Sequence, residues 1–148
     1  MVFCTPEQHE AFLDSAPEFE GMLRQGGTTL IKYWLDFSLE EETERMEARR
    51  LEPLKSGKTF SIDRPALEKF DDYAEARNLM LWRTSTSFAP WTIVRTSRKW
   101  PARIAIIKDL LSRFDYPGKD AGIVEQDRGI MFEFGPVYRT KAGWKGNR

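Results

Sequence analysis

Stretches whose apolar residues recur at helical spacing alternate along the chain with stretches that are apolar almost throughout, and this alternation predicts its secondary structure. Thr5, Pro6 and Gln8 have the spacing of a capping box with proline at the first helical position, which predicts a short helix to about Ser15. A second short helix is predicted from residue 17 to the paired glycines at 26 and 27, where the helical pattern stops.

Two segments have the composition of buried strands. Residues 28–37, "TTLIKYWLDF", and residues 89–96, "APWTIVRT", are rich in β-branched and aromatic side chains and show little polar alternation. This pattern is typical of strands that are covered on both faces, as in a parallel sheet.

Three more helices are predicted around the second strand. Ser38 and Glu41 form another capping box, which begins a helix that runs to about Arg50. The other two helices carry apolar stripes, formed by Leu67, Phe70, Ala74 and Leu81 within residues 64–83 and by Ile104, Ile107, Leu111 and Phe114 within residues 101–114. Arg77 falls inside the first of these stripes.

The order of the elements predicts the fold class. Strands separated by long helical stretches imply right-handed crossovers, and therefore an α/β layer fold. Residues 121–148 are harder to assign. The segment "GIMFEFG" has the composition of a short strand, but the presence of three glycines and the absence of acidic residues after Glu133 favour a loose basic tail.

Composition and charge restrict the class of protein. The 148 residues suffice for one domain with a hydrophobic core, and 23 basic residues balance 23 acidic ones, so no global field attracts nucleic acid or an anionic membrane. Cys4 is the only cysteine, which excludes a disulfide framework. No apolar run reaches the ~18 residues of a membrane span, and the first residues lack a signal-peptide pattern. We therefore expect a cytoplasmic protein without membrane or nucleic-acid partners.

Most catalytic side chains are absent or badly spaced. His9 is the only histidine, and a nucleophilic pair with Cys4 is less favoured than a surface histidine and a small buried thiol. Asp71 and Asp72 are adjacent on a predicted helix and point about 100° apart, which suits a solvated face better than a two-carboxylate site. No cluster has the ligand spacing of a zinc site.

The turn after residue 50 is the strongest candidate site. The cations that gather on and before it are Arg45, Arg49, Arg50, Lys55 and Lys58. Local pairing of Glu41 with Arg45 and of Glu47 with Arg50 explains the helical charges equally well. Local pairing does not explain Lys55 and Lys58, which have no acidic residue between them. Loop arginines and lysines suit phosphate oxygens. Arg77 either has a partner in the core or faces a charged site.

Five segments in order resemble the polyphosphate kinase 2 family: "FCTPEQHEAFLDSAPEFEGML", "RRLEPLKSGKTFSID", "KFDDYAEARNLML", "APWTIV" and "SRFDYPGKD". The resemblance covers residues 1–120 and leaves 121–148 as an unmatched basic tail. It implies part of a P-loop kinase fold, similar to thymidylate kinase: three layers with a short parallel sheet and a helical lid at about residues 38–83.

The resemblance also implies an activity. Family members move a phosphoryl group between inorganic polyphosphate and a nucleoside mono- or diphosphate, with Mg²⁺. The basic turn matches the lid, so Arg49, Arg50, Lys55 and Lys58 are expected to bind phosphate, with Arg45 and Arg77 in support. No residue of this chain is assigned a catalytic or metal-binding role.

Several positions depart from the family pattern. Glu52 stands in place of an aspartate and Gly57 in place of a tryptophan, while Ser97, Arg98 and Lys99 replace acidic or amide residues. The family's phosphate loop and magnesium-holding segment precede the first matched motif, and no Gly-x-x-x-x-Gly-Lys stretch occurs in this sequence.

We therefore expect a part of the kinase that is inactive alone. A non-catalytic remnant that binds polyphosphate or nucleotide is the alternative. An open edge on the first strand further predicts self-association.

Overall fold

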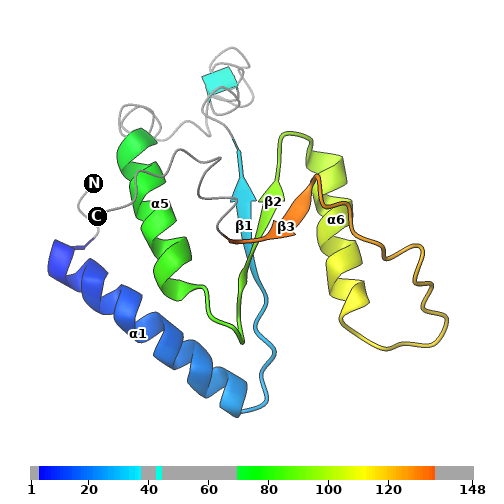
Figure 1. Cartoon of the computed structure of the whole chain (residues 1–148), viewed down its shortest axis with the longest axis horizontal. Coiled ribbons are helices and arrows are strands. Elements are labelled where there is room, and N and C mark those ends of the chain that lie inside the picture. The colour runs from blue at the N-terminus through cyan, green and yellow to red at the C-terminus, as the bar shows by residue number, and fades with distance from the viewer. Residues whose placement is uncertain (1–3, 38–42, 45–69, 136–148) are drawn as a thin grey trace, which may run out of the picture. The chain divides into compact units, whose positions relative to one another are not determined.

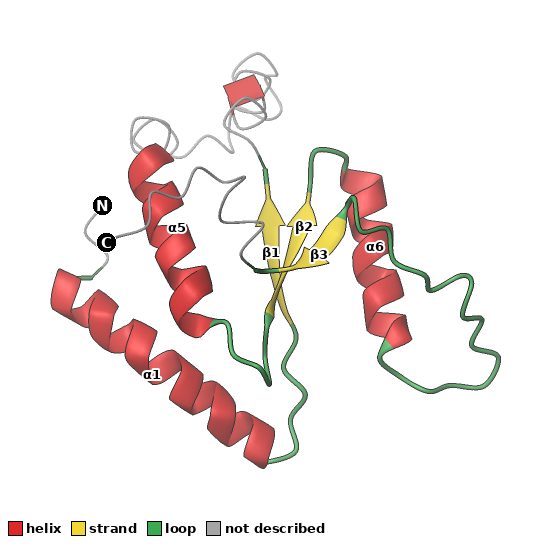
Figure 2. Ribbon diagram, in the orientation of Figure 1, coloured by secondary structure: helices red, strands yellow, loops and turns green. Residues whose placement is uncertain are grey.

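The computed structural model describes residues 4–37, 43–44 and 70–135 (Figure 1). Its elements follow the order α1 (Pro6–Gln25), β1 (Lys32–Asp36), α5 (Phe70–Thr84), β2 (Trp91–Arg95), α6 (Lys99–Ser112) and β3 (Met131–Glu133). Both strands predicted from apolar composition are present, and the α/β class is confirmed (Figure 2).

The three strands form one sheet in the order β1-β2-β3. β1 and β2 point the same way (Figure 2). β3 runs antiparallel to β2, because the Arg95 amide donates to the Ile130 carbonyl at 2.9 Å and the Phe134 amide donates to the Trp91 carbonyl at 2.8 Å. The segment "GIMFEFG" thus contains a strand, which adds to the predicted parallel pair and makes the sheet mixed.

α1 begins at the predicted capping box. The Thr5 hydroxyl accepts from the Gln8 amide at 3.3 Å, and the Gln8 side chain accepts from the Thr5 amide at 2.9 Å. The prediction of two short helices is wrong, because α1 continues through Pro17 to Gln25.

Long-range contacts hold both halves of α1. On the first half, Glu10 and Asp14 form ion pairs with Arg83, and on the second half Glu20 pairs with Lys32. Contacts on either side of Pro17 therefore keep the helix in one line, although proline removes one backbone hydrogen bond.

The chain divides into two compact units. One holds α1, the first residues of β1 and β2, and most of α5, and its buried apolar residues include Leu13, Leu81 and Ala89. The other holds α6 and the last residues of β1 and β2. Its buried residues include Ile93, Val94, Ala102, Ala105, Val124 and Met131.

Burial corrects two of the sequence predictions. β1 was predicted to be buried on both faces, yet its only buried residue is Lys32, and Leu35 is half exposed. α6 buries Ala102, Ala105 and Asp109 instead of the predicted apolar stripe, whose residues Ile104, Ile107, Leu111 and Phe114 are exposed. Small side chains let this helix lie close to its neighbours, which leaves the large side chains outside.

Some predictions lie outside the described residues. The helix predicted for residues 38–50 is described only at Thr43 and Glu44, which are helical. Most of the predicted lid and residues 136–148 lie outside as well. Within the residues that the structure describes, no helix is long and apolar enough to cross a membrane.

Candidate phosphate-binding edge of the sheet

The carboxyl ends of the parallel strands meet at one edge. The Thr96 amide and hydroxyl both donate to the Asp36 carbonyl, at 2.8 Å and 2.9 Å. These bonds join the residue after β2 to the last residue of β1. Ligands of open α/β sheets bind at this edge, outside the carboxyl ends of the strands.

Two cations follow β2 at this edge. Arg98 is the N-cap residue of α6 and makes no side-chain capping bond, and Lys99 is the first residue of the helix. Among the described residues, neither side chain has a hydrogen bond or an ion pair. The first turn of α6 contains no acidic residue. The free amides of a helix start favour anions, so Arg98 and Lys99 add full charges to an already positive end.

Trp100 and Arg103 continue this surface along α6. Trp100 is 72% exposed, and the Arg103 guanidinium carbon lies 5.5 Å from the centre of its ring. The arrangement joins an exposed aromatic face to a cation, which can contact a planar base as well as phosphate oxygens.

Arg95 is held toward the β3 side of the edge. Its guanidinium lies 5.4 Å from the centre of the Phe132 ring, and Nη1 donates to the Gly129 carbonyl at 3.4 Å. This cation is therefore oriented by its neighbours.

The lid cations predicted from the sequence, which are Arg45, Arg49, Arg50, Lys55 and Lys58, lie outside the described residues. The segment that carries them begins at Ser38, two residues after the carboxyl end of β1. Chain connectivity therefore starts the lid segment at the same sheet edge. The role of its cations in phosphate binding stays a prediction.

Arg77 is half-buried on α5. Its Nε donates to the Asn78 side-chain oxygen at 3.1 Å. Arg77 therefore has a hydrogen-bond partner, as the interpretation of a core arginine predicts. A contact between Arg77 and phosphate stays a prediction.

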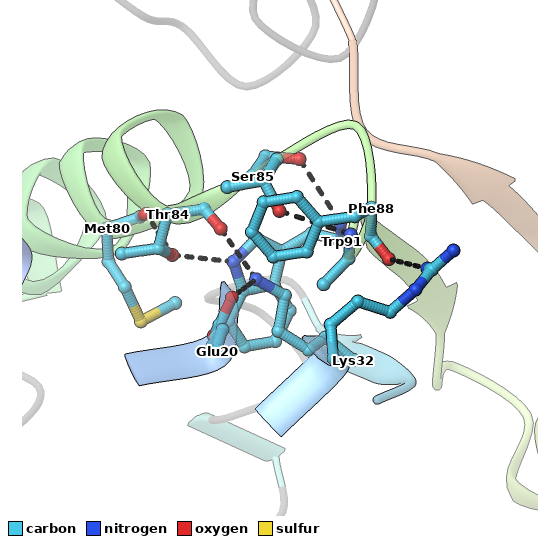
Figure 3. A network of polar contacts seen from close by, with 10 residues as sticks. Glu20, Lys32, Met80, Thr84, Ser85, Phe88 and Trp91 are labelled. Carbon is cyan, nitrogen blue, oxygen red and sulfur yellow. Dashed lines mark hydrogen bonds and ion pairs between the residues drawn. The ribbon is translucent and has the colours of Figure 1, made fainter. Parts of the chain in front are cut away.

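Sequence reasoning missed a buried polar network around Lys32 (Figure 3). The Lys32 ammonium donates to Glu20 at 2.7 Å and to the Thr84 carbonyl at 2.6 Å, and it lies 5.1 Å from the centre of the Trp91 ring. Trp91 Nε1 donates to the Thr84 hydroxyl at 2.8 Å. The partners of the Lys32 ammonium lie on α1, α5 and β2 and satisfy its charge. Because they tie Lys32 to three other elements, the network positions the start of β1. A lysine within the apolar run of residues 28–37 was its only signal.

Mg²⁺ was expected from the resemblance, and the described residues do not fit it. No group of three or more His, Cys, Asp or Glu side chains in the described ranges could hold a metal ion. Mg²⁺ requires several oxygen ligands in octahedral geometry. The described part of the chain therefore offers no magnesium site.

Residues 1–122 match the family described as Polyphosphate kinase 2. The chain belongs to the polyphosphate kinase 2 family. The resemblance found in the sequence motifs is thereby confirmed.

Curated members of the polyphosphate kinase 2 family are similar over most of this chain. NDP-polyphosphate phosphotransferase 2 of Ruegeria pomeroyi is 42% identical over 84% of this chain and 36% of its own length. ADP-polyphosphate phosphotransferase 1 of Rhizobium meliloti is 42% identical over 88% of this chain and 44% of its own. GDP-polyphosphate phosphotransferase of Pseudomonas aeruginosa is 40% identical over 95% of this chain and 39% of its own length. The chain spans about two fifths of the length of these relatives.

Solved polyphosphate kinase 2 structures share the fold. The crystal structure of Polyphosphate Kinase 2 from Arthrobacter aurescens TC1 has a TM-score of 0.69 and 32% identity, covering 79% of this chain and 44% of that one. The putative polyphosphate kinase 2 from Pseudomonas aeruginosa has a TM-score of 0.62 and 30% identity.

Proposed function

We propose that this chain provides part of a polyphosphate kinase 2 that moves a phosphoryl group between inorganic polyphosphate and a nucleoside mono- or diphosphate. One observation carries the proposal: within a family match over residues 1–122, Arg98 and Lys99, which have no side-chain partner among the described residues, follow β2 at the carboxyl edge of the parallel strands. The names of its relatives, which specify NDP, ADP and GDP, support the substrate class.

The proposed role of the cations is electrostatic. The transferred phosphoryl group spreads negative charge over its oxygens, and catalysis consists mainly of positioning and charge stabilisation. Arg98 and Lys99 attract the polyanion to the sheet edge. Arg49, Arg50, Lys55 and Lys58 of the lid segment supply further donors to phosphate oxygens, with Arg45 and Arg77 in support.

We propose Mg²⁺ as the metal of the complete reaction. The described residues of this chain lack its ligands, so none of the roles assigned here depends on the metal.

A second function is favoured by the sequence itself. The 148 residues contain no Gly-x-x-x-x-Gly-Lys stretch, whose backbone amides and lysine hold phosphates in P-loop kinases. A polypeptide with the cations but without this loop is suited to bind polyphosphate or nucleotide without transfer. Turnover by the isolated chain would rule out this second function.

Polyphosphate binding by the whole chain tests the proposal, with fluorescence anisotropy of labelled polyphosphate as the readout. The double variant Arg98→Ala and Lys99→Ala should weaken binding about tenfold at low salt, with a shallower salt dependence. The control pair Arg24→Ala and Lys108→Ala also removes one arginine and one lysine, but from outside the edge. Equal loss in both pairs, or no binding at all, would overturn the proposed site.

A further inference from the structure

The start of α6 places a large aromatic ring beside cations. Trp100 is 72% exposed, which is the highest value among the exposed large apolar side chains of the described residues. The Arg103 guanidinium carbon lies 5.5 Å from the centre of its ring. In the described part of the chain, Arg103 has no hydrogen bond or ion pair. The guanidinium therefore orients the indole, and its own donors stay available to a ligand.

Three side chains at the start of α6 lie on one side of the helix. Lys99 and Trp100 are four and three residues before Arg103, so both are its neighbours on the helix surface. Ala102 and Ala105 occupy the buried side. Lys99 and Arg103 are like charges at a spacing where they repel, and the first turn holds no acidic residue to compensate them. An anion bound between the two cations would remove this repulsion.

We propose that Trp100 is the stacking surface for the base of the nucleoside diphosphate, while Lys99 and Arg103 contact its phosphates. The inference rests on the proposed function, because it places a substrate of that reaction at the same edge of the sheet. Every nucleobase has a π face that can stack on an aromatic side chain, and arginine adds a cation–π contribution. Because the base and the phosphates belong to one molecule, this short segment of α6 binds both of them.

The two substrates of the proposed reaction differ in their use of Trp100. Polyphosphate carries charge but no ring, so it binds to the cations and gains nothing from the indole. A nucleoside diphosphate uses the cations and the indole together. The indole also sets a preference among bases, because a purine overlaps a larger area of it than a pyrimidine does, and stacking strength then discriminates without hydrogen bonds to the base. Trp100 is therefore a residue that determines substrate specificity.

Isothermal titration calorimetry of the 148-residue chain at low salt tests the stacking surface, with ADP, UDP and pyrophosphate as probes. Pyrophosphate has the charge of the diphosphate without a base. Trp100→Ala should weaken ADP binding about tenfold, narrow the preference for ADP over UDP, and leave pyrophosphate binding unchanged. Trp100→Tyr keeps an aromatic face and should retain most of the affinity for ADP. Trp82→Ala is the matched control, since Trp82 is 49% exposed on a different helix, α5, and its replacement should not change ADP binding.

Labelled polyphosphate separates a failure of this inference from a failure of the proposed function. Lys99→Ala should weaken ADP, pyrophosphate and polyphosphate alike, whereas Trp100→Ala should leave polyphosphate binding unchanged. Polyphosphate binding together with an ADP affinity that is absent or insensitive to Trp100→Ala would overturn the stacking surface alone. Equal losses of ADP and pyrophosphate in Trp100→Ala would overturn it as well. Binding of ADP that depends on Trp100, without any binding of polyphosphate, would instead support the stacking surface and overturn the proposed function.

Discussion

The Lys32 ammonium lies 2.7 Å from the Glu20 carboxylate, and the lysine side chain is only 7% exposed. The pair joins the start of β1 to α1, and the Thr84 carbonyl accepts a further hydrogen bond from the same ammonium at 2.6 Å. A buried charge is tolerated only when it is paired and hydrogen-bonded. The stability of this unit therefore depends on both partners being present.

Removing the carboxylate charge should destabilise the fold. Glu20→Gln leaves the Lys32 ammonium buried without its counter-charge, which should cost about 3 kcal/mol in the free energy of unfolding. Urea denaturation followed by circular dichroism measures this difference. Glu10→Gln is the matched control, because Glu10 is more than half exposed and Asp14 still pairs with Arg83. Its effect should stay below ~1 kcal/mol, and equal losses would contradict a special role for the buried pair.

The start of α1 should show a pH effect. Hydrogen bonds from the backbone amide of Glu7 itself and from the Thr5 side chain hold the pKa of the Glu7 carboxyl below its ordinary value of 4.5. A group with a lowered pKa in the folded state contributes stability above its unfolded pKa and loses it as the pH falls through the folded pKa. We expect the carboxyl carbon of Glu7, followed by NMR, to titrate below 4.5.

The Thr5→Ala variant tests whether the Thr5 hydroxyl contributes to the lowered pKa of Glu7. It removes the second hydrogen-bond donor, so the pKa of Glu7 should move upward toward its ordinary value. A Glu7 pKa that is unchanged by Thr5→Ala would show that the hydroxyl does not contribute.

The isolated 148-residue chain should have no kinase activity. Phosphoryl transfer depends on a phosphate cradle and on charge stabilisation, and this sequence contains no Gly-x-x-x-x-Gly-Lys stretch. Purified chain with polyphosphate, Mg²⁺ and ADP or GDP should produce no triphosphate above a reaction without protein. Steady turnover would rule out the binding-only alternative and give the chain a catalytic site of its own.

The lid lysines should contribute to polyphosphate binding. Replacing Lys55 and Lys58 together by alanine should lower the affinity and flatten its dependence on salt, because fewer counterions are released on binding. Circular dichroism should show an unchanged fold. Titrations of labelled polyphosphate at two salt concentrations measure both effects, and an affinity equal to that of the unchanged chain would favour a solvated loop without a phosphate role.

Local signals were sufficient for several elements. The capping box of Thr5 and Gln8, the apolar runs around β1 and β2, and the motifs of the polyphosphate kinase 2 family were all readable from residues close together in the sequence. Such signals depend on backbone conformation and side-chain type within a few residues, which a sequence specifies directly.

The candidate site was predicted only in part. The sequence showed that Ser97, Arg98 and Lys99 depart from the family pattern. It did not show that Arg98 and Lys99 lack partners among the described residues. Whether these cations have partners depends on which acidic side chains the fold brings near them. The spacing of residues along the sequence does not specify those long-range neighbours.

What the sequence by itself determined is the start of α1, the presence of β1, β2, α5 and α6, the family, and the cations available for phosphate. Only the tertiary structure decided that α1 runs through Pro17, that Lys32 is the buried residue of β1, and that α6 turns its large side chains outward. Two of these outcomes depend on partners far along the chain, which are Arg83 for α1 and Thr84 for Lys32. The third depends on which face of α6 the fold buries, and that face carries Ala102 and Ala105. Burial is a property of the assembled layers, so a periodic apolar stripe shows that a helix has a packing face but not which neighbour covers it.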